Sequence, residues 1–313
     1  MNILVTGAYG FVGTNLCNKL EELGHKVYKV GRYKSNIEKI GDLRDKSFVK
    51  QIFDILSIDI VYHLAAKVGG IIANNSFKEE FYYDNTLINT NVVHEVIAHR
   101  IPKIIAIGTG CSYSNEDCDT RQLVESRLLE GIPREEHATY AYSKRNMLVH
   151  LMSAKDIYNL QYYMPIPANI YGPHDDFDYQ SSHVMASLIR RIVEAKKQDK
   201  DVVDIVGGIQ TRRDFIFVDD FVDALIALSN CSLFCGPINI ATGRLITIES
   251  LLYFIADIVG YEGTFNFLNS VPAGQVFRDF SVERIKSIGW NPRNSLEEGI
   301  EKTVEWCKEH YDN

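Results

Sequence analysis

The residues of this chain best suited to chemistry are Tyr140 and Lys144, which stand in a YxxxK pattern within the segment TYAYSK. On a helix, positions i and i+4 share one face, so the Lys144 ammonium is expected to lie near the Tyr140 phenol and to lower its pKa. A tyrosine tuned in this way passes a proton to or from a carbonyl oxygen while a nicotinamide exchanges hydride with the carbon. Thr109 stands upstream of this pair, in the hydroxyl-bearing turn that follows the apolar run KIIAI. The pattern predicts a nicotinamide-dependent oxidoreductase.

A glycine-rich turn follows the first apolar run, NILVT, and precedes a helical stretch. Glycines in this position let the backbone approach a pyrophosphate closely, and the helix N-terminus offers free N–H groups and a favourable dipole. A glycine trio alone is a weak signal, but its place between a strand and a helix at the N-terminus favours cofactor binding. The turn residues expected to bind a dinucleotide are Gly7, Tyr9, Gly10, Phe11, Val12 and Gly13.

The type of cofactor is indicated at the end of the second predicted strand, KVYKV. Sites that select NAD place an acidic residue there, roughly 20 residues after the glycines, to bind the ribose 2′-hydroxyl. This chain has Arg32 instead, and a guanidinium can pair with a 2′-phosphate, which favours NADP(H) over NAD(H). Asp42 and Leu43 are expected to border the adenine. Leu64, Ala65 and Ala66, at the end of the run DIVYHLA, are expected beneath the cofactor.

The elements that must position these residues alternate between strand and helix patterns. Apolar β-branched runs (NILVT, KVYKV, DIVYHLA, KIIAI and Gln161–Met164) are separated by helical stretches such as 11–23 and 47–56. This order predicts an α/β fold with a Rossmann-type doubly wound parallel sheet. After about residue 170 the alternation weakens into a helix over 184–195 and the strands VVDIVG and PINIAT. We therefore expect a dinucleotide-binding domain over 1–170, with returns near 212–242, and a smaller, mainly substrate-binding lobe over 171–313.

The last predicted helix, 296–311, has Ser295 as its N-cap residue and Glu298 three positions later, which is the spacing of a capping box.

Composition narrows the class of protein. The formal net charge of −8 opposes a broad electrostatic grip on nucleic acid but permits a local cationic pocket for a phosphorylated ligand. The six cysteines are scattered without a CxxC pair, so neither a disulfide framework nor a metal site is expected. No apolar run approaches the roughly 20 residues of a membrane span, and the start MNILVTG has no basic leader. A cytoplasmic protein that binds no metal, membrane or nucleic acid is expected.

With these motifs in place, the chain resembles the extended short-chain dehydrogenases/reductases over its whole length, including their Asn-bearing helix, matched by Asn85 and Asn91. Within that superfamily it is most similar to the GDP-L-fucose synthases, which act on GDP-4-keto-6-deoxymannose. Six blocks occur in the same order: AAKVGGIIANN from Ala65, GTGCSYS from Gly108, TYAYSK from Thr139, MPIPANIYGPHDDF from Met164, SHVMASLIRR from Ser182 and RRDFIFVDD from Arg212.

The resemblance implies a role for each matched residue. Thr109 takes the place of the active-site serine, and Tyr140 and Lys144 that of the proton-transfer pair. Cys111 is implied as the base and His183 as the acid of an epimerisation, before hydride delivery from NADPH to C4. The chemistry agrees, because a ketone at C4 acidifies the protons on C3 and C5. Taken singly, Cys111 also fits a small buried hydrophobe, and His183 a helix-start histidine.

The same resemblance implies a homodimer and a site for a GDP-linked sugar, whose diphosphate requires cations in an otherwise acidic chain. The positions it assigns to the substrate are Lys67, Val68, Gly69, Asn169, His183, Val184, Arg191, Arg213 and Arg278.

Four departures from the family pattern stand out. The family turn HRGMVG carries an arginine that helps to hold the NADP phosphate, whereas this chain has Tyr9. Thr109 replaces serine but keeps the hydroxyl, and Gly110 leaves a small gap. A segment around 114–118 is also shorter. The identity of the sugar, a hexose or a heptose, is therefore left open by the sequence.

Other functions compete with this interpretation. A 4,6-dehydratase needs an Asp-Glu pair after the active-site threonine, where this chain has Gly110 and Cys111, and a C4 epimerase needs neither Cys111 nor His183. A redox-neutral enzyme like GDP-mannose 3,5-epimerase and a C4 reductase without epimerisation, acting on a GDP-keto-sugar or GDP-heptose, both stay open. A non-catalytic, cofactor-sensing binding protein is a different class, and the intact Tyr140 and Lys144 argue against it.

Overall fold

The main sheet of the protein has six parallel strands in the order β2-β1-β3-β4-β5-β9. The computed structural model describes residues 1–32, 35–37, 41–69, 74, 76–118, 120–179, 182–268 and 275–311. The strands are β1 (Asn2–Thr6), β2 (Lys26–Val30), β3 (Ile60–His63), β4 (Lys103–Ala106), β5 (Gln161–Pro167) and β9 (Gly236–Ile240). Their near-continuous apolar character suits a parallel sheet that is covered on both faces, and Ile3, Leu4 and Val5 of β1 are fully buried.

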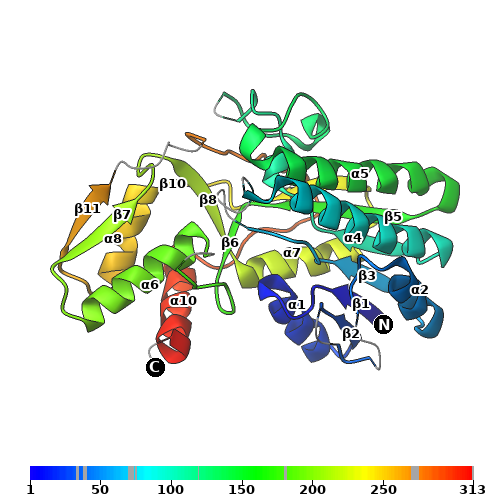
Figure 1. The fold of residues 1–313 in the computed structure, drawn as a ribbon, viewed down its shortest axis with the longest axis horizontal. Helices are drawn as coiled ribbons and strands as arrows, with labels where there is room; N and C mark the ends of the chain where they lie inside the picture. Colours follow the sequence, from blue (N-terminus) through cyan, green and yellow to red (C-terminus); the bar gives the residue numbers. More distant parts are fainter. Residues whose placement is uncertain are drawn as a thin grey trace.

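Helices cover both faces of this sheet (Figure 1). One layer contains α1 (Phe11–Glu22) and α7 (Val218–Asn230), and the other contains α2 (Lys46–Ile55), α4 (Lys78–Ala98) and α5 (Ala138–Tyr158). The predicted α/β, doubly wound, Rossmann-type fold is therefore confirmed. The strand order changes direction between β1 and β3, and ligands of open α/β sheets bind outside the carboxyl ends of the strands at such a switch point.

A smaller lobe follows the first five strands and lies to the left in Figure 1. It contains a three-stranded sheet, β10-β8-β6, and a two-stranded parallel sheet, β11-β7. Its strands are β6 (Asn169–Tyr171), β7 (Val202–Val206), β8 (Arg212–Phe217), β10 (Leu245–Thr247) and β11 (Thr264–Leu268). Its helices are α6 (Val184–Lys197), α8 (Ile248–Val259) and α10 (Leu296–Tyr311), whereas the short helix α9 (Glu283–Lys286) packs against β9 of the main sheet.

The capping box predicted for the last helix is confirmed. The Glu298 amide donates to Ser295 Oγ at 3.1 Å, and the Ser295 amide donates to Glu298 Oε2 at 2.8 Å. Two amides at the start of α10 are thus satisfied reciprocally, as this motif requires.

Some boundaries differ from the sequence analysis. The helix expected over 184–195 continues to Lys197, and the run PINIAT contributes to β9, which returns to the edge of the main sheet. The domain division at residues 170 and 171 stays a prediction. Among the described residues, no helix has both the length and the apolar character that a membrane span needs.

Candidate active site at the carboxyl edge of the main sheet

The glycine turn between β1 and α1 is packed backbone against backbone. Gly7 has φ +72°, and a Cβ added there would lie 2.8 Å from the Ala65 amide nitrogen, while one at Gly13 would lie 2.1 Å from the Gly7 carbonyl oxygen. Any side chain at either position would displace backbone, so both glycines are required by the fold. The turn is anchored to the second strand, because the Gly7 amide donates to the Val30 carbonyl at 2.8 Å.

The same turn fits the pyrophosphate of a dinucleotide. Gly10 is the N-cap residue of α1 and makes no side-chain cap, and the first turn of the helix contains no acidic residue. The amides of Phe11 and Val12 thus begin a helix whose dipole favours an anion, beside a backbone that no Cβ obstructs. Tyr9 lies half-buried at this turn.

The part of the carboxyl edge next to the glycine turn is formed by Arg32, Asp42 and the loop after β3. Arg32 Nε lies 3.3 Å from Asp42 Oδ2, and the Arg32 side chain is 54% exposed. Leu43 is buried. The Leu64 amide donates to the Thr6 carbonyl at 3.1 Å, which holds Leu64, Ala65 and Ala66 against the end of β1.

Thr109 and Cys111 stand in a short turn, η1 (Gly110–Ser112), after β4. Thr109 Oγ1 accepts a hydrogen bond from the Cys111 amide at 3.2 Å. A Cβ added to Gly110 would lie 2.7 Å from the Phe280 ring and 3.2 Å from an Arg278 nitrogen. The gap left by Gly110 is therefore occupied, and it brings Arg278 from the C-terminal part of the chain next to the Thr109 turn.

Tyr140 and Lys144 both lie on α5, as predicted, but the expected effect on the tyrosine is wrong. Burial raises the pKa of Tyr140 well above its ordinary value, and the nearby Cys111 thiol adds to this increase. Lys144 is almost fully buried, and burial lowers the pKa of its ammonium to about 7. Helical spacing alone does not reveal this, because desolvation of each group exceeds any effect of one on the other.

A buried polar line beneath Lys144 was not found by sequence reasoning. His63 Nδ1 lies 2.7 Å from Thr6 Oγ1, and His63 Nε2 lies 3.0 Å from Asn89 Oδ1. Asn89 Nδ2 then donates to the Ser143 carbonyl at 3.4 Å, which leaves Oδ1 to accept from His63 Nε2–H. Burial and the nearby Lys144 lower the pKa of His63 to about 3, so the imidazole is neutral. The one feature of the sequence that could have indicated this line was His63, a histidine in an otherwise apolar strand.

His183 is the N-cap residue of α6, with 63% of its side chain exposed. Its Nδ1 lies 3.9 Å from Oδ1 of the buried Asp175, and this carboxylate raises the pKa of the imidazole although burial opposes it. The other carboxylate oxygen, Oδ2, is buried and has no hydrogen-bond partner among the described residues. Asp175 thus favours the protonated form of His183, the form that an acid needs.

Two of the predicted substrate cations meet at Gln275, a buried residue that sequence reasoning missed. Arg213 Nη2 donates to the Gln275 carbonyl at 2.8 Å, and Arg278 Nε donates to Gln275 Oε1 at 2.9 Å. Arg191 lies apart from them on α6, where its Nε donates to Ser187 Oγ at 3.3 Å. The neighbouring Arg190 is committed to an ion pair with Glu194 at 2.7 Å, which agrees with a structural role.

Comparison with known proteins identifies the group to which this arrangement belongs. The profile of the NAD dependent epimerase/dehydratase family matches residues 3–238. The chain belongs to this family. The resemblance expected from the six sequence blocks is therefore confirmed.

Individual members of the NAD dependent epimerase/dehydratase family resemble the chain over nearly its full length. GDP-L-fucose synthase of Escherichia coli (strain K12) is 33% identical, covering 99% of this chain and 97% of the relative. The crystal structure of a GDP-L-fucose synthetase from Naegleria fowleri bound to NADP has a TM-score of 0.87 at 26% identity, covering 100% and 94%. A GDP-6-OMe-4-keto-L-xylo-heptose reductase from C. jejuni has a TM-score of 0.87 at 25% identity, covering 100% and 98%.

The remaining predicted substrate positions are spread around the edge in this family member. The Lys67 ammonium is held by Glu80 and by Asp84 on α4, and its backbone amide donates to Asn85 Oδ1 at 2.8 Å. In the same loop, Val68 is exposed and the Gly69 carbonyl accepts a hydrogen bond from Asn74. Asn169 is the first residue of β6, and Val184 is the first residue of α6. The block from Ala65 continues into 70–73 and 75, which lie outside the described residues.

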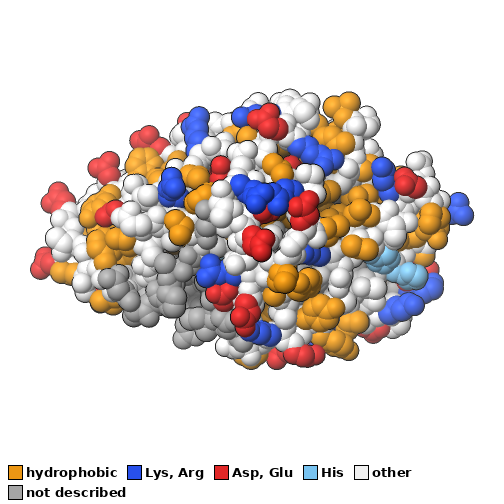
Figure 2. Space-filling model, turned by 90° about the horizontal axis from the view of Figure 1, so that it is seen from above, with side chains coloured by type: hydrophobic (Ala, Val, Ile, Leu, Met, Phe, Trp, Pro, Cys, Tyr) orange, Lys and Arg blue, Asp and Glu red, His pale blue; other side chains and the backbone are white. Residues whose placement is uncertain are grey.

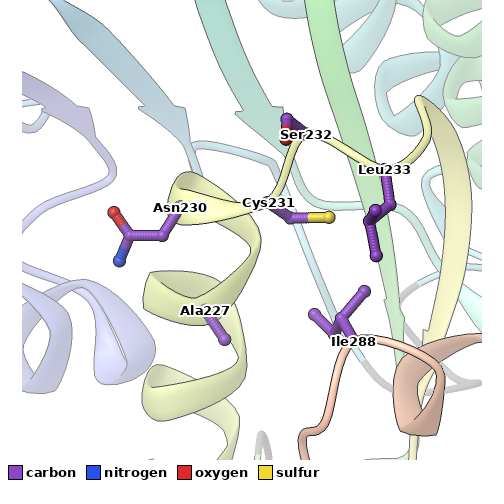
Figure 3. Close-up of a pocket in the computed structure, with 6 residues that line it drawn as sticks. All are labelled: Ala227, Asn230, Cys231, Ser232, Leu233 and Ile288. Carbon is purple, nitrogen blue, oxygen red and sulfur yellow. The ribbon is translucent and has the colours of Figure 1, made fainter.

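A separate hollow of about 290 Å³ lies at the opposite end of the sheet, lined by Ala227, Asn230, Cys231, Ser232, Leu233 and Ile288 (Figure 3). The Cys231 carbonyl accepts hydrogen bonds from Gln161 and Tyr163 at the start of β5, so this hollow is at the amino ends of the strands. It is not part of the Thr109 and Tyr140 site. Within the described ranges, no group of three or more His, Cys, Asp or Glu side chains could hold a metal ion.

The buried Lys144 gives the first prediction. The pKa of Lys144 is about 7 in the folded chain and 10.5 ordinarily, so the folded chain loses this proton first as the pH rises. The unfolded chain binds more protons between these values, and the free energy of unfolding should rise from about pH 7 to pH 10. Denaturant titrations at several pH values should show a flatter rise for Lys144→Met. Lys155→Met, an exposed lysine of the same helix, should keep the wild-type slope, and equal slopes in all three proteins would contradict the assignment.

Proposed function

We propose that this chain is an NADP(H)-dependent epimerase/reductase of a GDP-4-keto-6-deoxy sugar, like GDP-L-fucose synthase. The observation that carries the proposal is the grouping of Cys111, the protonated Tyr140 and the glycine cradle at the carboxyl edge of one sheet. The comparisons support it, because the E. coli relative and the N. fowleri structure carry this function and this cofactor in their names.

Each residue has a chemical task in this proposal. The ketone at C4 acidifies C3–H and C5–H, so Cys111 as thiolate removes a proton from one face and His183 returns one to the other. Asp175 assists by favouring protonated His183. Bound NADPH supplies the hydride for C4. Tyr140, whose raised pKa keeps the phenol protonated, then donates its proton to the C4 oxygen.

The substrate diphosphate is assigned to the cations of the lobe. Arg213 and Arg278 are held close together by Gln275, and the Gly110 gap places Arg278 beside the turn that carries Thr109 and Cys111. A guanidinium pair suits a diphosphate because its forks match phosphate oxygens. Arg191, Asn169, Val184 and the Lys67–Gly69 loop complete the proposed substrate site.

A C4 reductase without epimerisation is the second candidate. It is favoured by the likeness to the C. jejuni heptose reductase, which has the same TM-score as the NADP-bound N. fowleri structure. In that case Cys111 and His183 have no part in the reaction, and the sugar is a GDP-linked heptose or hexose ketone.

NADPH oxidation at 340 nm with GDP-4-keto-6-deoxymannose tests the proposal. We expect stoichiometric consumption and, by NMR of the product, inversion at C3 and C5. Consumption without inversion would support the C4 reductase. A product inverted without consumption of NADPH would show a redox-neutral epimerase instead, and no change with any keto-sugar would favour a non-catalytic binding protein.

Variants of the two epimerisation residues separate inversion from reduction. Cys111→Ser and His183→Gln should each lower the rate of hydrogen exchange at C3 and C5 into D2O by about 100-fold or more, because a general acid or base contributes on that scale. Binding of NADPH should stay unchanged. Cys235→Ser is the matched control, since Cys235 lies beyond α7, away from the carboxyl edge. Wild-type exchange in both active-site variants would exclude their proposed roles.

We also propose a homodimer formed through α4 and α5. Large hydrophobic side chains are exposed on these helices, namely Tyr82, Tyr83, Val149, Met152, Ile157 and Tyr158. Figure 2 views the molecule from this side and shows hydrophobic groups between charged ones. Analytical ultracentrifugation should give a dimer for the wild type and a monomer for Val149→Glu/Met152→Glu. Leu233→Glu, at a more exposed leucine outside these helices, should stay dimeric, and a wild-type monomer would refute the proposal.

A cytoplasmic location is likewise part of the proposal. No disulfide is formed among the described residues, which suits a reducing compartment, and cell fractionation would test this location.

A further inference from the structure

A fully buried asparagine, Asn239 on β9, joins three segments that are distant in the sequence. Its Oδ1 accepts a hydrogen bond from the Tyr113 hydroxyl at 2.7 Å. Its Nδ2 donates to two backbone carbonyls, that of Leu123 at 2.9 Å and that of Ser281 at 3.2 Å. Its backbone amide donates to Glu125 Oε1 at 2.9 Å. Both ends of the side-chain amide and the backbone beside it are therefore paired inside the protein.

The partners of Asn239 fix the orientation of its side-chain amide. A carbonyl oxygen can only accept, so the carbonyls of Leu123 and Ser281 face the nitrogen, which has two N–H groups to donate. The Tyr113 hydroxyl faces Oδ1. Burial, together with the nearby Glu125, raises the pKa of Tyr113, so the phenol keeps the proton that it donates. The two ends of the amide thus hold different segments.

The oxygen end of Asn239 leads to the turn that carries the proposed base. Tyr113 is the C-cap residue of η1 and follows Cys111 closely in the sequence. On its other side the turn is held by α5, because Arg145 Nε donates to the Ser112 carbonyl at 2.8 Å. The turn is therefore fixed between α5 and β9. Loss of the Tyr113 bond would free one side of the turn while the other side stays attached.

The nitrogen end of Asn239 leads to the segment that carries Arg278. The backbone just after Arg278 pairs with that of Leu123: the Leu123 amide donates to the Asp279 carbonyl at 2.7 Å, and the Ser281 amide donates to the Leu123 carbonyl at 2.9 Å. Asn239 donates to a carbonyl on each side of this pair. The position of Arg278 is thereby tied to β9.

The two segments that Asn239 holds also meet at the active site. The rings of Tyr113 and Phe280 pack with their centroids 6.2 Å apart. A Cβ added to Gly110 would lie close to both the Phe280 ring and an Arg278 nitrogen, at 2.7 Å and 3.2 Å. The proposed base and the proposed diphosphate ligand thus stand on segments that touch at Gly110 and are fastened to the same buried asparagine.

We propose that Asn239 is a positioning residue that sets the placement of Cys111 relative to Arg278: it holds the proton-abstracting turn through Oδ1 and the diphosphate-binding segment through Nδ2. The inference rests on the roles of Cys111 and Arg278 in the proposed function and deepens that function. A substrate held by its diphosphate presents C3 and C5 at a fixed distance from Arg278. A displacement of Cys111 by about 1 Å is enough to slow proton transfer by up to roughly 100-fold.

Tyr113→Phe tests the oxygen end, because it removes one hydroxyl and keeps the ring. The rate constant for hydrogen exchange at C3 and C5 of GDP-4-keto-6-deoxymannose in D2O should fall about tenfold. The Kd for GDP, measured by calorimetry, should change less than about twofold, because Asn239 Nδ2 still holds the segment after Arg278.

Tyr163→Phe is the matched control for Tyr113→Phe. The Tyr163 phenol is also buried, and it donates one hydrogen bond, to the Cys231 carbonyl at 2.6 Å, at the amino ends of the strands. Its loss should lower the free energy of unfolding by an amount comparable to that in Tyr113→Phe, as measured by denaturant titration. The exchange rate constant and the Kd for GDP should both stay at the wild-type values.

Asn239→Leu releases both ends and should lower the exchange rate constant and raise the Kd for GDP, each by about tenfold. In this variant the Tyr113 hydroxyl is buried without its acceptor, which destabilises the fold. Asn239→Leu/Tyr113→Phe removes that hydroxyl, so the free energy of unfolding should partly recover while exchange stays slow. A purely structural role predicts instead that exchange recovers together with stability.

Each outcome decides the proposal. It is overturned, with the proposed function intact, by wild-type exchange in Tyr113→Phe, by an equal loss in Tyr163→Phe, by a rise in the GDP Kd of Tyr113→Phe as large as its loss of exchange, or by recovery of exchange in the double variant. The comparison of Tyr113→Phe with Tyr163→Phe suffices where Asn239→Leu does not fold. A wild type without exchange at C3 and C5 would overturn the inference together with the epimerase step, so the two failures are distinguished by the wild-type protein.

Discussion

The contact on which the rest of the site depends is the approach of the glycine turn to the loop after β3. A Cβ at Gly7 would lie 2.8 Å from the Ala65 nitrogen, so β1 and β3 meet here through backbone alone. This meeting occurs where the strand order changes direction, and it leaves the start of α1 open on the same side. The cofactor cradle is therefore a consequence of sheet topology, and the glycines are the residues that permit it.

A second constraint joins the glycine turn to α5, the helix that carries Tyr140 and Lys144. Thr6, His63 and Asn89 form a buried hydrogen-bonded line that ends on the Ser143 carbonyl, beside Lys144. It crosses β1, β3, α4 and α5, and a neutral imidazole completes it. Burying a polar group is costly unless it is paired, so this line favours one placement of α5 against the sheet. The helix that carries Tyr140 is thus tied to the sheet by residues that have no part in the proposed chemistry.

Local patterns predicted the parts of this protein that depend on local physics. Each of three motifs depends only on residues that lie within one or two helical turns of one another in the sequence: the glycine turn, the YxxxK helix and the Ser295–Glu298 box. Gln275 could not be predicted, because its role arises from bringing together two arginines distant in sequence. The prediction that the Tyr140 pKa is lowered was wrong for a related reason. Spacing shows which groups are near one another, but not how much water each group loses on folding.

The departures from the family turn acquire a physical meaning in this setting. Tyr9 removes a cation from the glycine turn, and beyond β2 Arg32 and Arg44 both pair with Asp42. Gly110 removes a side chain beside Thr109, and the Phe280 ring and the Arg278 guanidinium occupy that space. At the Thr109 turn, space left by a change in the motif is thus filled by groups from a distant segment. Tertiary structure, and not the motif alone, determines which groups lie at the site.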